Sequence, residues 1–167
     1  SKENIAKDME KIKAAGFTDI IVDVRPTTGD VLFNTNVVDQ VKRMDVWGNS
    51  GYSYYERTET WDYLQAFIEE ARIQGLKVNA SINTFVGGDL CPYNLGHDGV
   101  LFRDESKKGW ASVANLADGL TNTMDLLDDE TDYGAKFFNP ANDDVQNFVL
   151  QLLADLAKYD LDGIILD

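Results

Sequence analysis

The side chains best suited to chemistry in this sequence stand where the predicted strands end. Asp167 ends one apolar run, Asp23 and Arg25 end another, and Asn83 and Asn139 follow two more. A carboxylate in such a position can attack an anomeric carbon, stabilise an oxocarbenium-like transition state or activate a water. A guanidinium holds hydroxyl or carboxylate groups through its planar fork, and an amide both donates to and accepts from sugar hydroxyls. We therefore take Asp167 as the catalytic candidate and the other four residues as candidates for substrate binding.

Each of these residues also has a structural interpretation. Asp167 could form an ion pair with Arg25 or cap the next element, and an adjacent guanidinium would hold the carboxylate ionised. Because side chains alternate along a strand, Asp23 and Arg25 are expected to face the same way, so that Asp23 could pair with Arg25 instead of a substrate. Asn139 precedes Pro140, which is typical of a turn or a helix start.

The elements that position these residues alternate between helix and strand. Apolar residues at helical spacing, capping residues and apolar β-branched runs predict, in chain order, a helix at 3–15, a strand at 19–24, a helix at 62–74, a strand at 76–82, a short strand at 136–140, a helix at 142–158 and a strand from 162. This alternation favours a parallel sheet with right-handed crossovers. A doubly wound sheet and a (β/α)8 barrel both fit. The first strand is not followed by G-x-G-x-x-G, which counts against a dinucleotide-binding fold.

Two connections on one side of the predicted sheet are much longer than ordinary βα loops. Residues 26–59 and 84–135 follow strand ends, whereas such loops usually run about 2–6 residues. The chain therefore places its extra length at the carboxyl ends of the strands, where parallel-sheet folds build active sites.

These long loops are rich in aromatic residues. They contain Trp47, Tyr52, Tyr54, Tyr55, Phe85, Tyr93, Phe102 and Trp110. Aromatic faces beside carboxylates and amides suit sugar rings, and we take Trp110 as a further substrate-binding candidate. The same rings could instead form the small cores of the loops.

The composition excludes several classes of protein. An apolar fraction of 44% argues against disorder, and a net charge of −14 argues against nucleic-acid binding. No apolar run reaches the 18 residues of a membrane span. Cys91 and His97 are the single cysteine and the single histidine, so a zinc site of the usual ligands is implausible and a cysteine nucleophile is disfavoured. We predict no resident metal or cofactor.

Short motifs in order resemble the glycosyl hydrolase-like 10 family. They are Ala15-Gly16-Phe17, Ile20-Ile21-Val22-Asp23-Val24-Arg25-Pro26 with Gly29-Asp30, Trp61-Asp62-Tyr63-Leu64, Gly75-Leu76-Lys77-Val78 with Ile82-Asn83, Phe138-Asn139-Pro140, and Tyr159-Asp160-Leu161-Asp162-Gly163-Ile164 with Asp167. The segment 84–135 matches poorly, and Thr84 stands where the family usually has proline.

The resemblance implies a bacterial (β/α)8 protein that hydrolyses glycosidic bonds and is exported, secreted or lipid-anchored. It makes Asp167 a catalytic or substrate-binding carboxylate and a cell-wall or dietary polysaccharide the substrate. Independently of the resemblance, Asp162 starts the strand that Asp167 ends, so we expect it to lie at the opposite end and to be structural. The family's second aspartate would follow Asp167, and its partner acid lies on a later strand.

We therefore expect residues 1–167 to form one domain that covers about the first four βα units of a (β/α)8 barrel and is incomplete at its carboxyl end. Glycoside hydrolysis normally needs two carboxyl groups about 5–9.5 Å apart, so the isolated chain is expected to be inactive. Two alternatives stay open: a non-catalytic carbohydrate-binding barrel, and a barrel enzyme that holds Mg²⁺ with Asp167 and Asp23.

Overall fold

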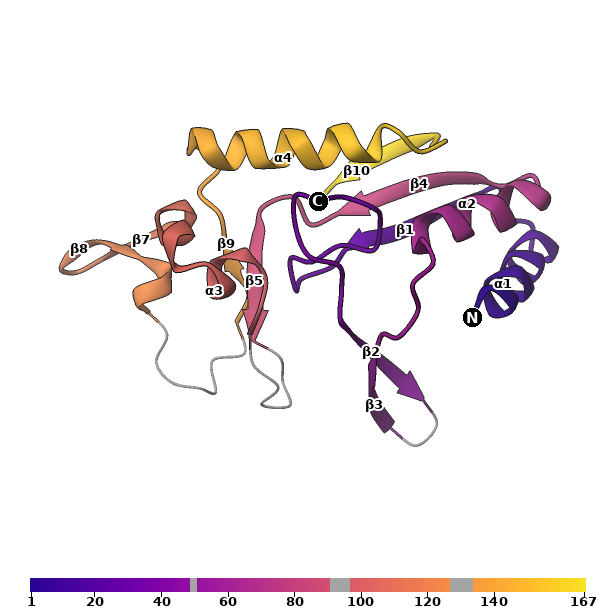
Figure 1. Cartoon of the computed structure of the whole chain (residues 1–167), viewed down its shortest axis with the longest axis horizontal. Coiled ribbons are helices and arrows are strands. Elements are labelled where there is room, and N and C mark those ends of the chain that lie inside the picture. Colours follow the sequence, from indigo (N-terminus) through magenta and orange to yellow (C-terminus); the bar gives the residue numbers. More distant parts are fainter. Residues whose placement is uncertain (49–50, 91–96, 127–133) are drawn as a thin grey trace.

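The computed structural model describes residues 1–48, 51–90, 97–126 and 134–167 (Figure 1). The helices in these ranges are α1 (Lys2–Ala14), α2 (Tyr63–Ile73), α3 (Val100–Arg103) and α4 (Asp143–Leu156), with the 3-10 helices η1 (Glu105–Trp110) and η2 (Thr123–Asp125). The strands are β1 (Asp19–Arg25), β2 (Arg43–Gly48), β3 (Gly51–Glu56), β4 (Lys77–Ile82), β5 (Val86–Leu90), β6 (His97–Asp98), β7 (Val113–Leu116), β8 (Gly119–Asn122), β9 (Lys136–Phe137) and β10 (Gly163–Leu166). None of the described helices is both long enough and apolar enough to cross a membrane.

A three-stranded parallel sheet forms the centre of the fold, in the order β1-β4-β10. Val22 of β1 lies opposite Ala80 of β4, which in turn lies opposite Ile164 of β10. The parallel pairing of these three strands and the helices before and between them agree with the sequence pattern. Figure 1 shows α2 running beneath the sheet and α4 leading back to β10.

The prediction of a (β/α)8 barrel is wrong for this structure. Among the described residues the parallel strands form an open sheet that does not close, and the remaining strands form small antiparallel sheets. The strand predicted at 136–140 does not join the parallel sheet: its first residues form β9, which pairs antiparallel with β5. The sequence pattern did not predict β5, so it could not reveal that this partner was available.

Local capping explains where two of the helices begin. The side chain of Asp62 accepts a hydrogen bond from the backbone of Gln65 (3.1 Å), which starts α2. Asn142 does the same for Asp144 and Val145 at the start of α4. These caps satisfy N–H groups that the first turn of a helix leaves unpaired.

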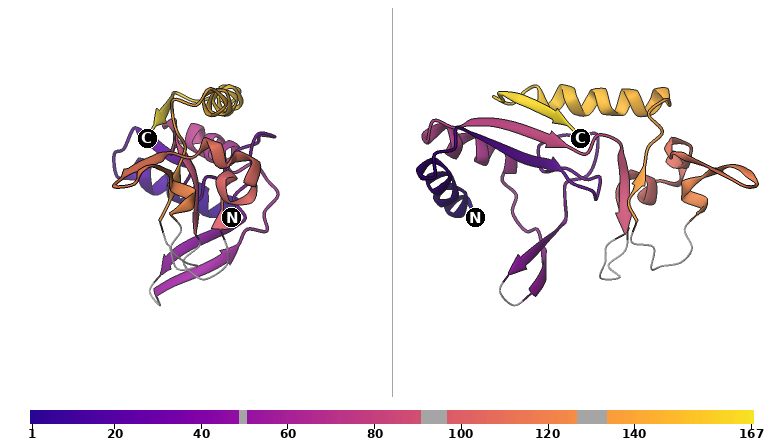
Figure 2. Two further views of the ribbon diagram at one scale, coloured as in Figure 1. Left: turned by 90° about the vertical axis from the view of Figure 1, so that its left-hand side faces the viewer. Right: turned by 180° about the vertical axis from the view of Figure 1, so that it is seen from behind.

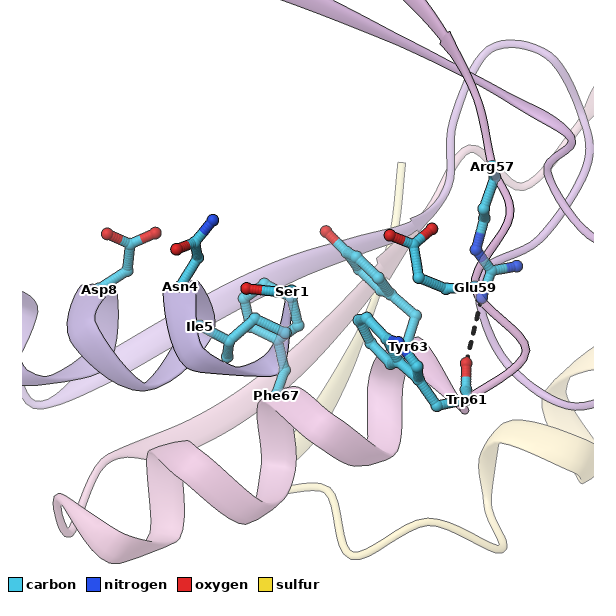
Figure 3. A pocket seen from close by; sticks show the side chains of 9 residues that line it. All are labelled: Ser1, Asn4, Ile5, Asp8, Arg57, Glu59, Trp61, Tyr63 and Phe67. Carbon is cyan, nitrogen blue, oxygen red and sulfur yellow. Dashed lines mark hydrogen bonds between the residues drawn. The ribbon is translucent and has the colours of Figure 1, made fainter.

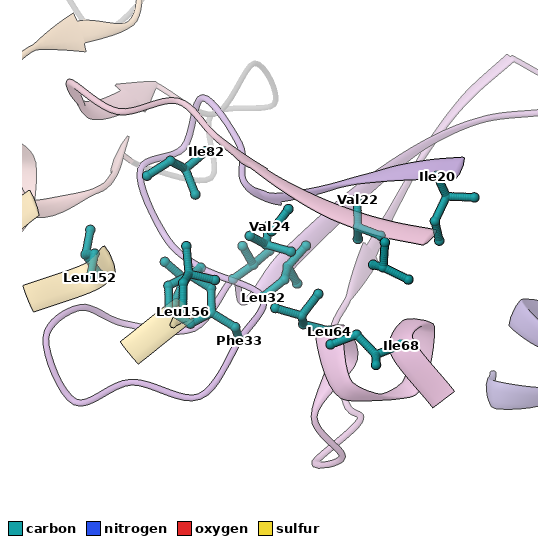
Figure 4. Close-up of a cluster of buried hydrophobic side chains, with 14 of the residues drawn as sticks. Ile20, Val22, Val24, Leu32, Phe33, Leu64, Ile68, Ile82, Leu152 and Leu156 are labelled. Atoms are coloured by element: carbon teal, nitrogen blue, oxygen red, sulfur yellow. The ribbon is translucent and has the colours of Figure 1, made fainter. Parts of the chain in front are cut away.

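The core lies on one face of the parallel sheet (Figure 4). Alternate residues of the strands point into it, and α2, α4 and the segment after β1 cover them. The side chains labelled in Figure 4 are Ile20, Val22, Val24, Leu32, Phe33, Leu64, Ile68, Ile82, Leu152 and Leu156, and all are buried. A fully buried aliphatic or aromatic side chain contributes roughly 1.5–3 kcal/mol, so this face supplies most of the apolar stabilisation of the sheet.

The two long connections carry the antiparallel elements (Figures 1 and 2). The first holds the β2–β3 hairpin, which projects away from the parallel sheet, and the second holds β5, β6 and the β7–β8 hairpin. The connections are joined by Arg103, which contacts buried Asp30 through both terminal nitrogens and Asp98 at 3.4 Å. Gly99 (φ +97°) lies so close to Gly88 that a side chain on it would strike backbone atoms.

Candidate functional site

The second face of the parallel sheet is not covered in the described structure, and it carries a row of polar side chains. Along β1 the buried residues alternate with exposed ones, and Asp23 belongs to the exposed set. Asp23 lies opposite Ser81, and Ser81 lies opposite Ile165. Asp167 follows two residues later and therefore points to the same side as Ile165. We call this surface, defined by Asp23, Ser81, Asn83 and Asp167, the open face.

A β-bulge separates Arg25 from this surface. The register shifts between Asp23 and Arg25, because Asp23 pairs with Ser81 whereas Arg25 pairs with the next residue of β4, Ile82. Val24 and Arg25 are consequently both buried. The assumption that Asp23 and Arg25 share a face by alternation fails at this point, since a bulge inserts one extra residue and reverses the faces that follow it.

The guanidinium of Arg25 has a structural role. It is fully buried and donates to the backbone carbonyls of Asn83, Thr84 (3.5 Å) and Val86 (2.5 Å), which fixes the chain where it leaves β4. Its Cζ atom also lies over the rings of Phe138 and Phe148, at 6.0 and 5.8 Å. Burial lowers the pKa of Arg25 to about 10 although the charge of Asp30 opposes this, so the group is charged at neutral pH. No contact in the described structure directs Arg25 toward a ligand on the open face.

Asp23 and Asp167 are the two acids of the open face. An oxygen of Asp23 accepts a hydrogen bond from the backbone of Arg25 (3.2 Å). Burial raises the pKa of the Asp23 carboxyl, the Arg25 bond opposes this rise, and the negative charge of Asp167 adds to it. The backbone of Asp167 is held by Ile82 and Thr84 at 3.0 Å each, while its side chain is exposed. The sheet therefore holds both acids at its carboxyl end with their side chains on one surface.

Asn83 lies between these acids in the strand order. Its side-chain amide donates to the backbone carbonyl of Arg25 (3.0 Å), and its backbone N–H donates to the same oxygen. The residue thus joins the ends of β1 and β4 and is partly exposed. Ser81 also belongs to the open face, although it was not among the predicted site residues. The sequence could have indicated Ser81, because the alternation of side chains along a strand places Ser81 on the same side as Asn83.

Asn139 and Trp110 lie away from the acids. The side chain of Asn139 accepts from the backbone of Ala141 (3.0 Å) in the turn before α4, and its backbone N–H donates to Trp110 (2.7 Å). The Trp110 ring packs on Phe138 and Phe148, with centroids 5.9 and 5.6 Å away. Because Phe148 belongs to α4, Trp110 lies on the covered side of the sheet. The structure brings these two candidates together but does not bring them to the open face.

Several other residues considered in the sequence are not placed on this surface by the described structure. Tyr93, Cys91 and the side chains of Trp47, Tyr52, Tyr54 and His97 lie outside the part of the chain that the structure describes. Phe85 packs against the core, and Tyr55 is exposed on β3. Within the described ranges, no group of three or more histidine, cysteine, aspartate or glutamate side chains could hold a metal ion.

The Asp162 side chain is structural, as the sequence predicted. One of its oxygens accepts from the backbone N–H of Val78 (2.8 Å) and from the Arg72 guanidinium (2.7 Å), which lowers the pKa of the Asp162 carboxyl. These contacts tie β10 to β4 at the end of the sheet opposite the open-face acids.

Comparison with known proteins found similarities both in sequence and in structure. No protein-family model matches the chain. An S-layer-related protein of Niallia circulans is 28% identical over 174 residues, which cover 99% of this chain and 10% of that protein. An alpha-L-fucosidase isoenzyme 2 from Paenibacillus thiaminolyticus has a similar fold, with a TM-score of 0.59 and 19% identity, over 100% of this chain and 20% of the fucosidase. The chain thus corresponds to about a tenth of one relative and a fifth of the other, and at these identities the likeness to the fucosidase concerns the backbone fold.

Proposed function

We propose that the open face binds a carbohydrate and that Asp167 and Asp23 hydrolyse a glycosidic bond there. The observation that carries this proposal is the placement of two carboxyl groups on one surface, with the pKa of one of them raised. Glycosidases use one protonated and one ionised carboxyl group. Asp23, whose protonated form is favoured, suits the general acid, and Asp167 suits the nucleophile or the base that activates water.

The strand order bears on the stereochemistry of the proposed reaction. Neighbouring strands lie about 4.8 Å apart, so β1 and β10, with β4 between them, lie about 10 Å apart, and Asp167 stands two residues beyond the level of Asp23. Inverting glycosidases separate their carboxyl groups by about 6.5–9.5 Å, whereas retaining ones hold them about 5–5.5 Å apart. Because the backbones of Asp23 and Asp167 lie farther apart than a retaining pair of carboxyl groups requires, we propose that Asp167 activates a water instead of attacking the sugar itself. Asn83 and Ser81, which lie between the acids, would contact hydroxyl groups of the sugar.

The comparisons support the choice of ligand and of location. One similar protein is by name an alpha-L-fucosidase, which makes α-L-fucosides the first substrates to test. The other is named as S-layer-related, which supports a place at the bacterial cell surface and a cell-wall polysaccharide as the substrate. Both inferences are proposals for this chain, since it spans a small part of each protein.

The test is hydrolysis of aryl glycosides, beginning with p-nitrophenyl α-L-fucopyranoside, by the wild-type chain and by single variants. We expect slow hydrolysis that is lost in Asp167→Asn and reduced in Asp23→Asn. Asp19→Asn is the matched control, because Asp19 is an exposed residue at the other end of the same strand. Hydrolysis that persists in Asp167→Asn would exclude Asp167 from catalysis.

A non-catalytic carbohydrate-binding role is the second candidate. Asp167 is exposed, and Asp23 is exposed as a residue although its carboxyl group is partly buried, whereas active sites usually exclude water around the reacting groups. Saccharide binding by the wild-type chain, with no hydrolysis of any glycoside tested, would favour this role. It would also agree with the sequence-based expectation that the isolated chain is inactive. The Mg²⁺-dependent alternative would require hydrolysis that a chelator abolishes.

A further inference from the structure

We propose that a cleft between α1 and the segment leading into α2 binds one sugar ring, as a subsite separate from the open-face acids. The cleft has a volume of about 150 Å³ and is drawn in Figure 3. Its assignment to a sugar rests on the proposed function, but its occupancy can be measured without any hydrolysis.

Aromatic rings form the floor of this cleft. The rings of Trp61 and Tyr63 are stacked, with centroids 6.1 Å apart and an interplanar angle of 10°. Tyr63 continues the row to Phe67, at 4.9 Å and 47°. All three side chains are partly exposed and line the cleft. A continuous apolar and aromatic floor of this kind can pack against the C–H face of a sugar ring.

Polar side chains of α1 form one wall. Ser1, Asn4 and Asp8 are spaced so that they lie on one side of the helix. Figure 3 shows the side chains of Asn4 and Asp8 pointing the same way, with Ser1 at the start of the helix beside them. All three are exposed and line the cleft. A hydroxyl, an amide and a carboxylate in a row supply both donors and acceptors.

Arg57 and Glu59 form the opposite wall. The Arg57 guanidinium is held in place because it donates to the carbonyl of Trp61 (3.2 Å) and to the side chain of Gln40 (3.4 Å). Glu59 is exposed beside the Tyr63 hydroxyl (Figure 3). The two walls therefore offer hydrogen-bonding groups around an aromatic floor, as the edges and faces of a sugar require.

The size and charge of the cleft favour a neutral ring over other ligands. Sites for drug-sized ligands usually occupy about 300–1,000 Å³, so this cleft suits a single small ring. An aromatic floor beside acids could also attract an organic cation. However, the Lys2 ammonium already lies 5.9 Å from the centre of the Trp61 ring. Because a cation of the chain itself holds this position, a neutral polyhydroxy ligand fits better.

Charges from the cleft wall and from the open face both act on the Tyr63 hydroxyl. Burial raises the pKa of the Tyr63 hydroxyl, the charge of Arg57 lowers it and the charge of Asp23 raises it. Tyr63 is thus within electrostatic reach both of the cleft wall and of the open-face acid.

The test is NMR titration of the tryptophan indole N–H signals of the full chain with methyl glycosides of glucose, galactose and mannose. The chain has three tryptophans, and we expect the Trp61 signal to shift while that of Trp110 does not. The double variant Asn4→Ala/Asp8→Ala should weaken binding by about tenfold or more, since it removes hydrogen-bonding groups on one wall. Lys7→Ala/Glu10→Ala is the matched control, because these exposed residues of α1 do not line the cleft, and it should bind as the wild type does.

Three results would overturn the proposal: no response to any of the glycosides, a response of Trp110 in place of Trp61, or a response of Trp61 to tetramethylammonium alone. Asp167→Asn separates this proposal from the hydrolytic one. If Asp167→Asn shifts Trp61 on titration as the wild type does and no hydrolysis is found, the subsite stands without the proposed reaction. If aryl glycosides are hydrolysed and Trp61 never responds, the subsite is wrong and the reaction stands.

Discussion

Asp23 and Asp167 lie on the same face of the parallel sheet, and the negative charge of Asp167 adds to the effect of burial in raising the pKa of Asp23. The two residues come from opposite ends of the chain and meet because β4 pairs with both β1 and β10. The relationship is therefore a product of strand order, and it can be tested without knowing the substrate.

Removing the charge of Asp167 should lower the pKa of the Asp23 carboxyl. In Asp167→Asn the like charge that disfavours ionised Asp23 is absent, while the burial of Asp23 is unchanged. The pKa is measured by NMR titration of the side-chain carboxyl carbons. Asp19→Asn provides the control and should leave the Asp23 titration unchanged. An identical Asp23 titration in Asp167→Asn and wild type would mean that the acids do not interact.

Asp23 should make the stability of the fold depend on pH. The pKa of Asp23 is raised in the folded state, so folding favours the protonated carboxyl group. The stabilisation that results is complete below the pKa of Asp23 in the unfolded chain, and it is lost as the pH rises through the pKa of Asp23 in the folded chain. Asp23→Asn, which keeps an oxygen for the Arg25 N–H, should therefore unfold at a higher urea concentration than wild type at pH 7. The difference should disappear below the ordinary aspartate pKa of about 3.9. A variant that is less stable at pH 7 would contradict this assignment.

Arg25 should be required for the fold. Arg25→Met removes the donors of the Asn83, Thr84 and Val86 carbonyls in a buried position. Leaving a buried carbonyl without its donor costs about 1–3 kcal/mol, and three carbonyls lose one here, so we expect the free energy of unfolding, measured with urea, to fall by several kcal/mol. Arg25→Lys keeps a charge but not the planar fork, so its free energy of unfolding should lie between those of the wild type and Arg25→Met. A loss below about 1 kcal/mol for Arg25→Met would show that the side chain is dispensable and would reopen a ligand-binding role.

Tyr159 should stabilise the junction of α4, α2 and the segment after β1. Its hydroxyl donates to the Asp62 side chain (2.5 Å) and accepts from the backbone of Asn34 (2.8 Å). Burial is the main cause that raises the pKa of the Tyr159 hydroxyl, and the hydrogen bond to Asp62 is the second. The hydroxyl therefore stays protonated at all ordinary pH values. Tyr159→Phe should lower the free energy of unfolding by about 1–3 kcal/mol, because it leaves both partners without this bond.

The control for Tyr159 is Tyr55→Phe, since Tyr55 is an exposed tyrosine on β3. Thermal and urea unfolding of both variants give the comparison. Equal stabilities of the two variants would show that the Tyr159 hydroxyl contributes nothing beyond its ring, which packs edge-on against Phe33.

The residues of the motif around Tyr159 have structural roles in this fold. The segment from Tyr159 to Gly163 carries part of the resemblance to a glycosidase family. In the structure Tyr159 anchors α4 and Asp162 ties β10 to β4. A side chain on Gly163 would strike the Asn79 side chain. Each of these roles is structural. The candidate for a chemical role in this segment is Asp167, whose side chain is exposed at the end of the strand.

The sequence by itself determined the elements whose causes are local. Capping side chains at Asp62 and Asn142, the apolar stripes behind them and the alternation in β1 and β4 act within a few residues, so the helices and the parallel strands lie where the pattern placed them. The position of Asp167 at a strand end and the structural role of Asp162 follow from the same local order.

Only the tertiary structure decided which strands pair and which way three key residues point. Phe137 joins an antiparallel strand because β5 offers a partner, and this pairing leaves the parallel sheet with three strands and no closed barrel. A bulge at Val24 turns Arg25 into the core, and the order β1-β4-β10 brings Asp23 and Asp167 to one face. These outcomes depend on hydrogen bonds and burial between segments far apart in the chain, and such partners leave no periodic signal in the sequence.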